Sequence, residues 1–218
     1  MTRNHLIITT AALLLAVALS LSLPTPSHAG PASDKTLAEW QAIYSYWEFG
    51  DADDASADFD TDASGNTIVG NVVLMPIPNT FGDGTAGSVD VTLNSGESFF
   101  LPLWGLLGTS YTDGTPSDEF FSVNVFKTLE ISFKIDGDAV VTSANVMDDY
   151  SKYEFDPEIP IDFAPIDSVI WIQGISILHS PLSTGRHTMT LDVKNTIPVF
   201  GSIFEYHNTW NMRVVKAR

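Results

Sequence analysis

The stretch Leu129-Glu130-Ile131-Ser132-Phe133-Lys134-Ile135 alternates apolar and polar side chains without interruption. Successive side chains of a β-strand point to opposite faces, so this pattern indicates a strand with one buried face and one wet face. Other runs rich in Val, Ile, Phe and Thr are also expected to be strands. They are residues 67–75, 89–93, 98–104, 121–126, 139–143, 169–178, 187–193 and 203–215. Short strands without alternating helices predict an all-β fold, an antiparallel β-sandwich or jelly roll.

The segments between these runs carry turn residues. Asn-Ser-Gly at 94–96, Asp-Gly-Asp at 136–138 and Ser-Thr-Gly at 183–185 predict three β-hairpins. Pro102 lies inside a strand-like run, which predicts either an edge strand or a β-bulge there. Residues 148–167 contain three prolines and many acids without ligand-like spacing, and are expected to form a long irregular loop.

One amphipathic helix is expected before the strands, within residues 30–50. Leu37, Trp40, Tyr44 and Trp47 recur at spacings of three and four, which places them on one helical face. Thr36 and Glu39 have capping-box spacing, with Ser33 as an alternative N-cap, and Gly50 ends the pattern. The aromatic face favours a helix docked on a sheet; the alternative is a platform for stacking sugars.

The first 29 residues resemble an export signal. Arg3 supplies a positive start, residues 6–23 are almost entirely apolar, and Ser27-His28-Ala29 offers small residues where a signal peptidase reads. Cleavage is expected after Ala29, which leaves residues 30–218 as a single β-sandwich domain that is secreted or periplasmic. The alternative is a retained N-terminal anchor. No later run is as long and apolar, so no membrane span is expected after cleavage.

Composition excludes several classes of protein. The chain has 10 Lys and Arg against 27 Asp and Glu, a formal charge of -17, and no cysteine. Nucleic acid is not expected as a partner, because nothing would replace the counterions around its phosphates. The lack of cysteine excludes disulfides, thiolate metal sites and cysteine catalysis.

Four stretches resemble a group of secreted bacterial proteins of uncharacterised function, in which a tryptophan-rich helix precedes a β-sandwich. They are Gly-Asn-Val-Val-Leu-Met-Pro at 70–76, the run 91–103 that leads into Phe-Phe-Leu-Pro-Leu-Trp at 99–104, Ser-Tyr-Thr-Asp-Gly-Thr-Pro at 110–116, and Pro-Leu-Ser-Thr-Gly-Arg-His-Thr at 181–188. These are strand and turn motifs. The resemblance therefore implies the fold and the location, and it implies no catalytic residue.

The acidic loop at residues 51–66 suggests a calcium site. Asp60-Thr61-Asp62-Ala63-Ser64-Gly65 matches the opening of a calcium-binding loop, in which alternate oxygen side chains converge around a glycine turn. Asn66 would add its carbonyl oxygen, but Asn71 stands where a bidentate Glu is needed. An upstream carboxylate would replace that Glu. The predicted ligands are Asp58, Asp60, Asp62, Ser64 and Asn66, with Asp51, Asp53 and Asp54 as other upstream donors. The alternative is a solvated acidic loop.

Loop aromatics suggest a glycan contact, because flat rings stack on the apolar faces of sugars. Tyr111 beside Asp113, together with Tyr150 and Tyr153, are the candidate ligand-binding residues, whereas Trp171 in a strand is expected to be buried. The alternative for all of these aromatics is packing in the core.

Catalytic signatures are weak. The chain has neither the Gly-x-Ser-x-Gly nor the Ser-x-x-Lys motif, and a zinc site would require His179, His187 and His207 to converge, with Glu205 as a further ligand. The sequence therefore favours an exported non-catalytic binding, envelope or matrix protein that contacts a glycan or envelope component, with calcium ordering the acidic loop. The alternative is an extracellular polysaccharide hydrolase or lyase that uses paired carboxylates.

Overall fold

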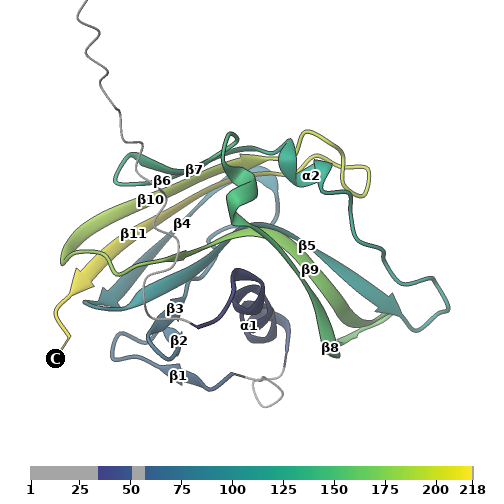
Figure 1. The fold of residues 1–218 in the computed structure, drawn as a ribbon, viewed down its shortest axis with the longest axis horizontal. Coiled ribbons are helices and arrows are strands. Elements are labelled where there is room, and N and C mark those ends of the chain that lie inside the picture. Colours follow the sequence, from purple (N-terminus) through teal and green to yellow (C-terminus); the bar gives the residue numbers. More distant parts are fainter. Residues whose placement is uncertain (1–33, 51–56, 218) are drawn as a thin grey trace, which may run out of the picture.

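Two β-sheets pack face to face in the computed structural model, which describes residues 34–50 and 57–217 (Figure 1). One sheet has six strands in the order β1 (Phe59–Thr61), β2 (Thr67–Val69), β3 (Val72–Leu74), β5 (Ser98–Tyr111), β9 (Ile166–His179) and β8 (Tyr150–Phe163). The other has five, in the order β4 (Asp83–Asn94), β11 (Glu205–Val215), β10 (Gly185–Lys194), β6 (Glu130–Ile135) and β7 (Asp138–Thr142). The predicted β-sandwich is confirmed. The predicted export segment, residues 1–29, lies outside the described residues.

The alternating stretch behaves as its pattern predicts. Ile131, Phe133 and Ile135 of β6 are buried between the sheets, whereas Glu130 and Lys134 are exposed. Phe133 meets the fully buried Trp210 of β11 edge to face, with ring centroids 6.4 Å apart. Phe99 and Leu101 of β5 belong to the same core from the opposite sheet. The apolar faces of the two sheets therefore cover one another.

The two sheets are mixed rather than purely antiparallel. β4 pairs with β11 and β3 pairs with β5 in parallel, while the other pairings are antiparallel. The turns at 94–96 and 183–185 lead the chain from one sheet into the other, so the hairpins predicted there are wrong. The turn at 136–138 does join a hairpin, β6 and β7, with Asp136 and Gly137 at φ values of 54° and 89°. A turn sequence specifies a chain reversal but not the sheet that the next strand joins.

Two other local expectations are wrong. Most of the segment 148–167 is strand rather than loop: a short 3₁₀ helix, η1 (Val146–Asp149), leads into β8, and β9 begins at Ile166. Pro157 and Pro160 are tolerated because β8 is an edge strand whose register with β9 is interrupted between Glu154 and Ile159, and Pro165 lies in the turn before β9. Residues 121–126 form no strand, and the short helix α2 (Asn124–Lys127) lies there instead. At Pro102 the bulge alternative holds, because β5 is an interior strand whose register shifts between Pro102 and Trp104.

Helix α1 (Leu37–Phe49) docks on the six-stranded sheet, on the face opposite the sandwich core (Figure 1). Its capping box forms as predicted, with Thr36 as the N-cap and Glu39 as its partner, and Gly50 is the C-cap. Trp40 and Tyr44 are buried against Phe100 of β5, within a cluster separate from the main core. The docked-helix interpretation is therefore confirmed. No helix among the described residues is long and apolar enough to span a bilayer.

A row of small residues under α1 allows this close contact. Gly174 of β9 lies opposite Gly105 of β5 on one side and Ser151 of β8 on the other. The buried side chain of Gln41 rests over this row, where its Oε1 accepts a hydrogen bond of 2.6 Å from the Ser151 hydroxyl. A Cβ added at Gly174 would lie 2.4 Å from Gln41 Nε2 and 2.8 Å from the Trp104 carbonyl oxygen. Docking of α1 on the sheet therefore requires glycine at position 174.

We expect Gly174→Ala to destabilise the protein by about 1–3 kcal/mol, because the new methyl group overpacks the helix–sheet contact and must displace backbone. Gly105→Ala is the matched control, since its Cβ would meet nothing closer than the Gln173 carbonyl oxygen at 3.5 Å. Urea unfolding of both variants measures the difference. Equal losses of stability in the two variants would contradict this account of helix docking.

Candidate functional site

The aromatic residues predicted to bind a ligand lie in three separate places. The Tyr111 hydroxyl, at the end of β5, donates to the Asp118 carboxylate at 3.1 Å. Tyr150 packs on Phe126 beside the main core, while Tyr153 belongs with the cluster under α1, so these two lie on opposite faces of β8. Asp113 accepts the backbone N–H of Thr115 in an exposed turn, and this hydrogen bond lowers the pKa of the Asp113 carboxyl.

A different set of side chains converges near Tyr111. The far ends of β5, β8 and β9 extend beyond the five-stranded sheet, and the segment after β5 returns across them toward α2 (Figure 1). Asp118 anchors that segment, because its carbonyl oxygen accepts a 2.9 Å hydrogen bond from the buried Trp171 indole. The half-buried Phe120 ring lies on Trp171 at 4.8 Å between centroids. Trp171 is buried as predicted, but it forms the floor of an open cleft.

We call this feature the acidic–aromatic cleft. It is lined by Asp118, Glu119, Phe120, Glu154, Phe155, Glu158, Ile170 and Trp171. One wall is the segment 118–120 and the other is β8, with β9 between them. Lys152, also on β8, places its ammonium group 4.5 Å from the centre of the Phe120 ring. The cleft thus combines an aromatic surface with several hydrogen-bond acceptors and one donor.

The carboxylates of the cleft differ in what they already bind. Asp118 accepts hydrogen bonds from the Thr109 amide at 3.0 Å and the Thr109 hydroxyl at 2.9 Å, besides that of Tyr111, so its carboxylate is engaged in holding the segment. Glu158 accepts from the Ser168 hydroxyl. Glu119 and Glu154 are exposed, and their carboxylates accept no hydrogen bond from the described residues, which leaves these carboxylates available to a ligand.

The predicted calcium loop is a tight turn between β1 and β2. One carboxylate oxygen of Asp62 accepts the amides of Ser64 and Asn66 at 2.8 Å each, and the other accepts the side-chain amides of Asn66 and Asn94. The Asn66 carbonyl oxygen, expected as a ligand, accepts the Asp62 amide at 3.0 Å. Asp58 and Asp60 are exposed. The upstream donors Asp51, Asp53 and Asp54 lie outside the described residues.

Within residues 34–50 and 57–217, no group of three or more His, Asp or Glu side chains is placed to hold a metal ion. Calcium binding at this turn stays a prediction.

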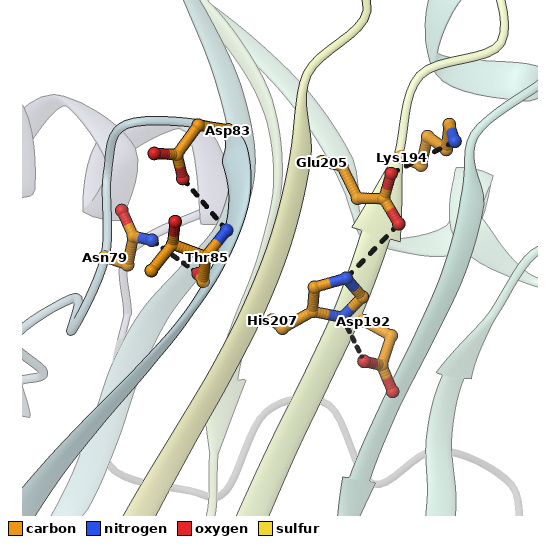
Figure 2. A network of polar contacts seen from close by, with 7 residues as sticks. All are labelled: Asn79, Asp83, Thr85, Asp192, Lys194, Glu205 and His207. Carbon is orange, nitrogen blue, oxygen red and sulfur yellow. Dashed lines mark hydrogen bonds and ion pairs between the residues drawn. The ribbon is translucent and has the colours of Figure 1, made fainter.

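The three histidines expected in a zinc alternative lie in separate networks. The His179 ring stacks on Phe99 with centroids 5.0 Å apart, and His187 of β10 contacts Asp136 in the adjacent β6–β7 turn. His207 lies between Asp192 at 2.7 Å and Glu205 at 3.2 Å, and Lys194 pairs with Glu205 at 3.0 Å (Figure 2). The hydrogen bond to Asp192, and then that to Glu205, raises the pKa of His207. This network is exposed, so solvent weakens its contribution to stability.

A second polar cluster in Figure 2 fixes the start of β4. Asp83 accepts the Thr85 amide at 2.9 Å, and the Asn79 side-chain amide donates to the Thr85 carbonyl oxygen at 2.5 Å. The hydrogen bond from the Thr85 amide is the main reason why the pKa of Asp83 is lowered. These contacts shape the loop before β4.

Comparison with protein-family models, with curated proteins and with solved structures found no match. The resemblance to secreted bacterial sandwich proteins therefore stays a hypothesis.

We expect Asp62→Ala to destabilise the protein by about 1–3 kcal/mol in urea unfolding, because the half-buried donors of Asn66 and Asn94 lose their acceptor. Asp60→Ala is the control, since the one hydrogen bond that the exposed Asp60 carboxylate accepts within the described part of the chain comes from the neighbouring Thr61 amide. The same proteins melted in chelator and in millimolar calcium test the ion separately. A calcium-bound turn predicts a higher melting temperature with calcium in the wild type and a smaller shift in Asp60→Ala. Equal melting temperatures for the wild type would count against calcium.

The contacts of His187 predict that the free energy of unfolding depends on pH. Its Nδ1 lies 2.6 Å from an Asp136 carboxylate oxygen and its Nε2 lies 2.9 Å from the Ser183 carbonyl oxygen, so both ring nitrogens face acceptors. The hydrogen bond to Asp136 raises the pKa of His187, although partial burial opposes it. A raised folded-state pKa stabilises the protein fully below the unfolded value of about 6.5, and this gain is lost as the pH rises through the folded value.

The stability difference between wild type and His187→Gln should therefore be larger at pH 6 than at pH 9. Urea unfolding at both pH values measures it. The lowered pKa of Asp136 acts only at acidic pH and does not disturb this window. His207→Gln is the comparison, because its pair is more exposed and should give a weaker effect. A pH-independent difference for His187→Gln would contradict the proposed charge on this ring.

Proposed function

We propose that the protein is an exported, non-catalytic β-sandwich that binds an extracellular glycan or envelope component in the acidic–aromatic cleft. The observation that supports this is the convergence of the Phe120 ring, seated on Trp171, with the exposed carboxylates of Glu119 and Glu154. A sugar ring has an apolar face that stacks on an aromatic side chain and hydroxyl groups that donate to carboxylates. The cleft offers both partners within one short stretch of surface.

The charge of the cleft selects among glycans. It brings together Asp118, Glu119, Glu154 and Glu158, and Lys152 is the one basic side chain that contacts its aromatic ring among the described residues. The whole chain has a formal charge of -17, which also repels anionic surfaces. The preferred ligands are therefore neutral or amino sugars, while uronic acids and sulfated sugars are disfavoured.

Phe120→Ala should weaken glycan binding at least about tenfold, equivalent to about 1.4 kcal/mol, because the ring supplies the stacking surface. The measurement is a glycan array with the full chain, followed by titration of the best neutral or amino-sugar hit. Phe81→Ala is the matched control, since Phe81 is 82% exposed and does not line the cleft. An array without hits, or equal losses in both variants, would contradict the proposal.

Lys152 separates two modes of binding in the same cleft. In the described conformation its ammonium covers the Phe120 ring, so a stacked sugar must displace it. If stacking dominates, Lys152→Ala binds the glycan as well as the wild type or better. If hydrogen bonding from Lys152 dominates, that variant loses affinity while Phe120→Ala keeps it, and the stacking mechanism is then wrong.

A further inference from the structure

A second cavity, of about 180 Å³, lies between α1 and the sandwich and opens to solvent. It is bounded by the last turns of α1, the loop at residues 77–80, and parts of β5, β9 and β11. We propose that it binds a small molecule with an apolar body of about one aromatic ring and a positively charged amine. This site is on the α1 side of the six-stranded sheet, and it is independent of the glycan proposal.

The cavity exists because α1 covers only part of a broad apolar face. The helix is held through two clusters, one around Trp40 and Tyr44 and the other around Ala42 and Tyr46. Beside these contacts the facing side chains are small, since Ser45 of α1 and Gly105 of β5 both line the cavity. The curved sheet continues beyond the helix (Figure 1), and the cavity lies beside the last turns of α1.

The walls suit an apolar ligand. Ile77, Pro102, Leu107, Ile172 and Phe49 belong to its apolar lining. An engineered apolar cavity of roughly 150 Å³ binds benzene, so a cavity of about 180 Å³ fits a single ring with a short substituent. The size therefore limits the ligand to about one ring.

Most polar groups in the walls already have protein partners. The Tyr44 hydroxyl donates to the Met75 carbonyl oxygen at 2.9 Å, and the Ser45 hydroxyl donates to the Gln41 carbonyl oxygen at 2.9 Å. Asn79 and Asn208 exchange two hydrogen bonds of 3.0 Å each. Because these groups already have hydrogen-bond partners, they need none from a ligand. The interior of the cavity therefore favours a ligand with apolar surface.

The mouth of the cavity carries negative charge. Glu48 lies in the last turn of α1, is exposed, and belongs to the lining. The C-terminal end of a helix carries a partial negative charge, and the last turn of α1 has no basic residue to offset it. No Lys or Arg is present among the residues that line this cavity. The two negative features together favour a cationic head group over a neutral or anionic one.

The test uses benzylamine, benzyl alcohol and benzoate, which share one ring and differ in charge. Titration of the full chain, followed by NMR amide shifts, should show that benzylamine binds, that benzyl alcohol binds more weakly and that benzoate binds weakest. Glu48→Gln should reduce the preference for benzylamine over benzyl alcohol, because only the helix end then favours the cation, while leaving the affinity for benzyl alcohol unchanged. Failure of wild type to bind benzylamine, or unchanged discrimination in Glu48→Gln, would overturn the proposal.

Filling the cavity tests the location. Gly105→Val adds a side chain into the space, and a Cβ at this position meets only ordinary contacts. It should abolish binding of both benzylamine and benzyl alcohol, and Leu107→Trp serves as a second filling variant if Gly105→Val does not fold. Phe120→Ala should leave benzylamine binding unchanged, which separates this site from the cleft. Benzylamine binding that survives both filling variants would place the site elsewhere and overturn the inference.

Discussion

The six-stranded sheet is apolar on both of its faces, and the rest of the structure depends on this constraint. Phe99, Phe100 and Leu101 are consecutive residues of β5 and all are fully buried, although neighbouring side chains of a strand point in opposite directions. Phe99 and Leu101 face the five-stranded sheet, and Phe100 faces α1. A sandwich of two sheets alone would leave Phe100 and its neighbours in water. The helix is therefore a third layer that the sheet requires.

Incomplete cover of this sheet produces both candidate sites. On the inner face, the sheet extends beyond its partner, and the segment around Phe120 covers the projecting part and leaves the acidic–aromatic cleft. On the outer face, one helix is about 10–12 Å wide and cannot cover strands of 14 residues such as β5, β8 and β9. The cavity beside Ser45 and Gly105 is part of this outer face that the helix leaves uncovered. Both sites thus lie where one layer ends before another.

Sequence patterns predicted the features that depend on neighbours along the chain. The alternation at 129–135, the capping box at Thr36 and the hairpin at 136–138 are local, and all three are confirmed. The partner of each strand is not local. The turns at 94–96 and 183–185 reverse the chain, but burial of the strands that follow decides which sheet they join, and this led to the wrong hairpins.

The candidate site was harder to predict for the same reason. Of the predicted aromatics, Tyr111 contacts the cleft through its hydrogen bond to Asp118. Tyr150 and Tyr153 are separated by an odd number of positions and so point to opposite faces of β8. Phe120 and Trp171 meet from distant parts of the chain, and no spacing in the sequence encodes that contact. The aromatic pair and the acidic side chains share a cleft only because the fold brings the segment 118–120 against β8 and β9.

The abundant acids of this chain divide into two groups by what they bind. One group accepts backbone amides in turns or at strand ends, and it comprises Asp62, Asp83, Asp113 and Asp136. A motif that resembles an ion site can therefore serve to hold a turn together. A carboxylate that already accepts amide protons has fewer lone pairs for a ligand. The acids without such partners are better indicators of function. Glu48 at the mouth of the cavity and Glu154 in the cleft are of this kind, because each is exposed beside apolar surface and its carboxylate accepts no hydrogen bond from the described residues.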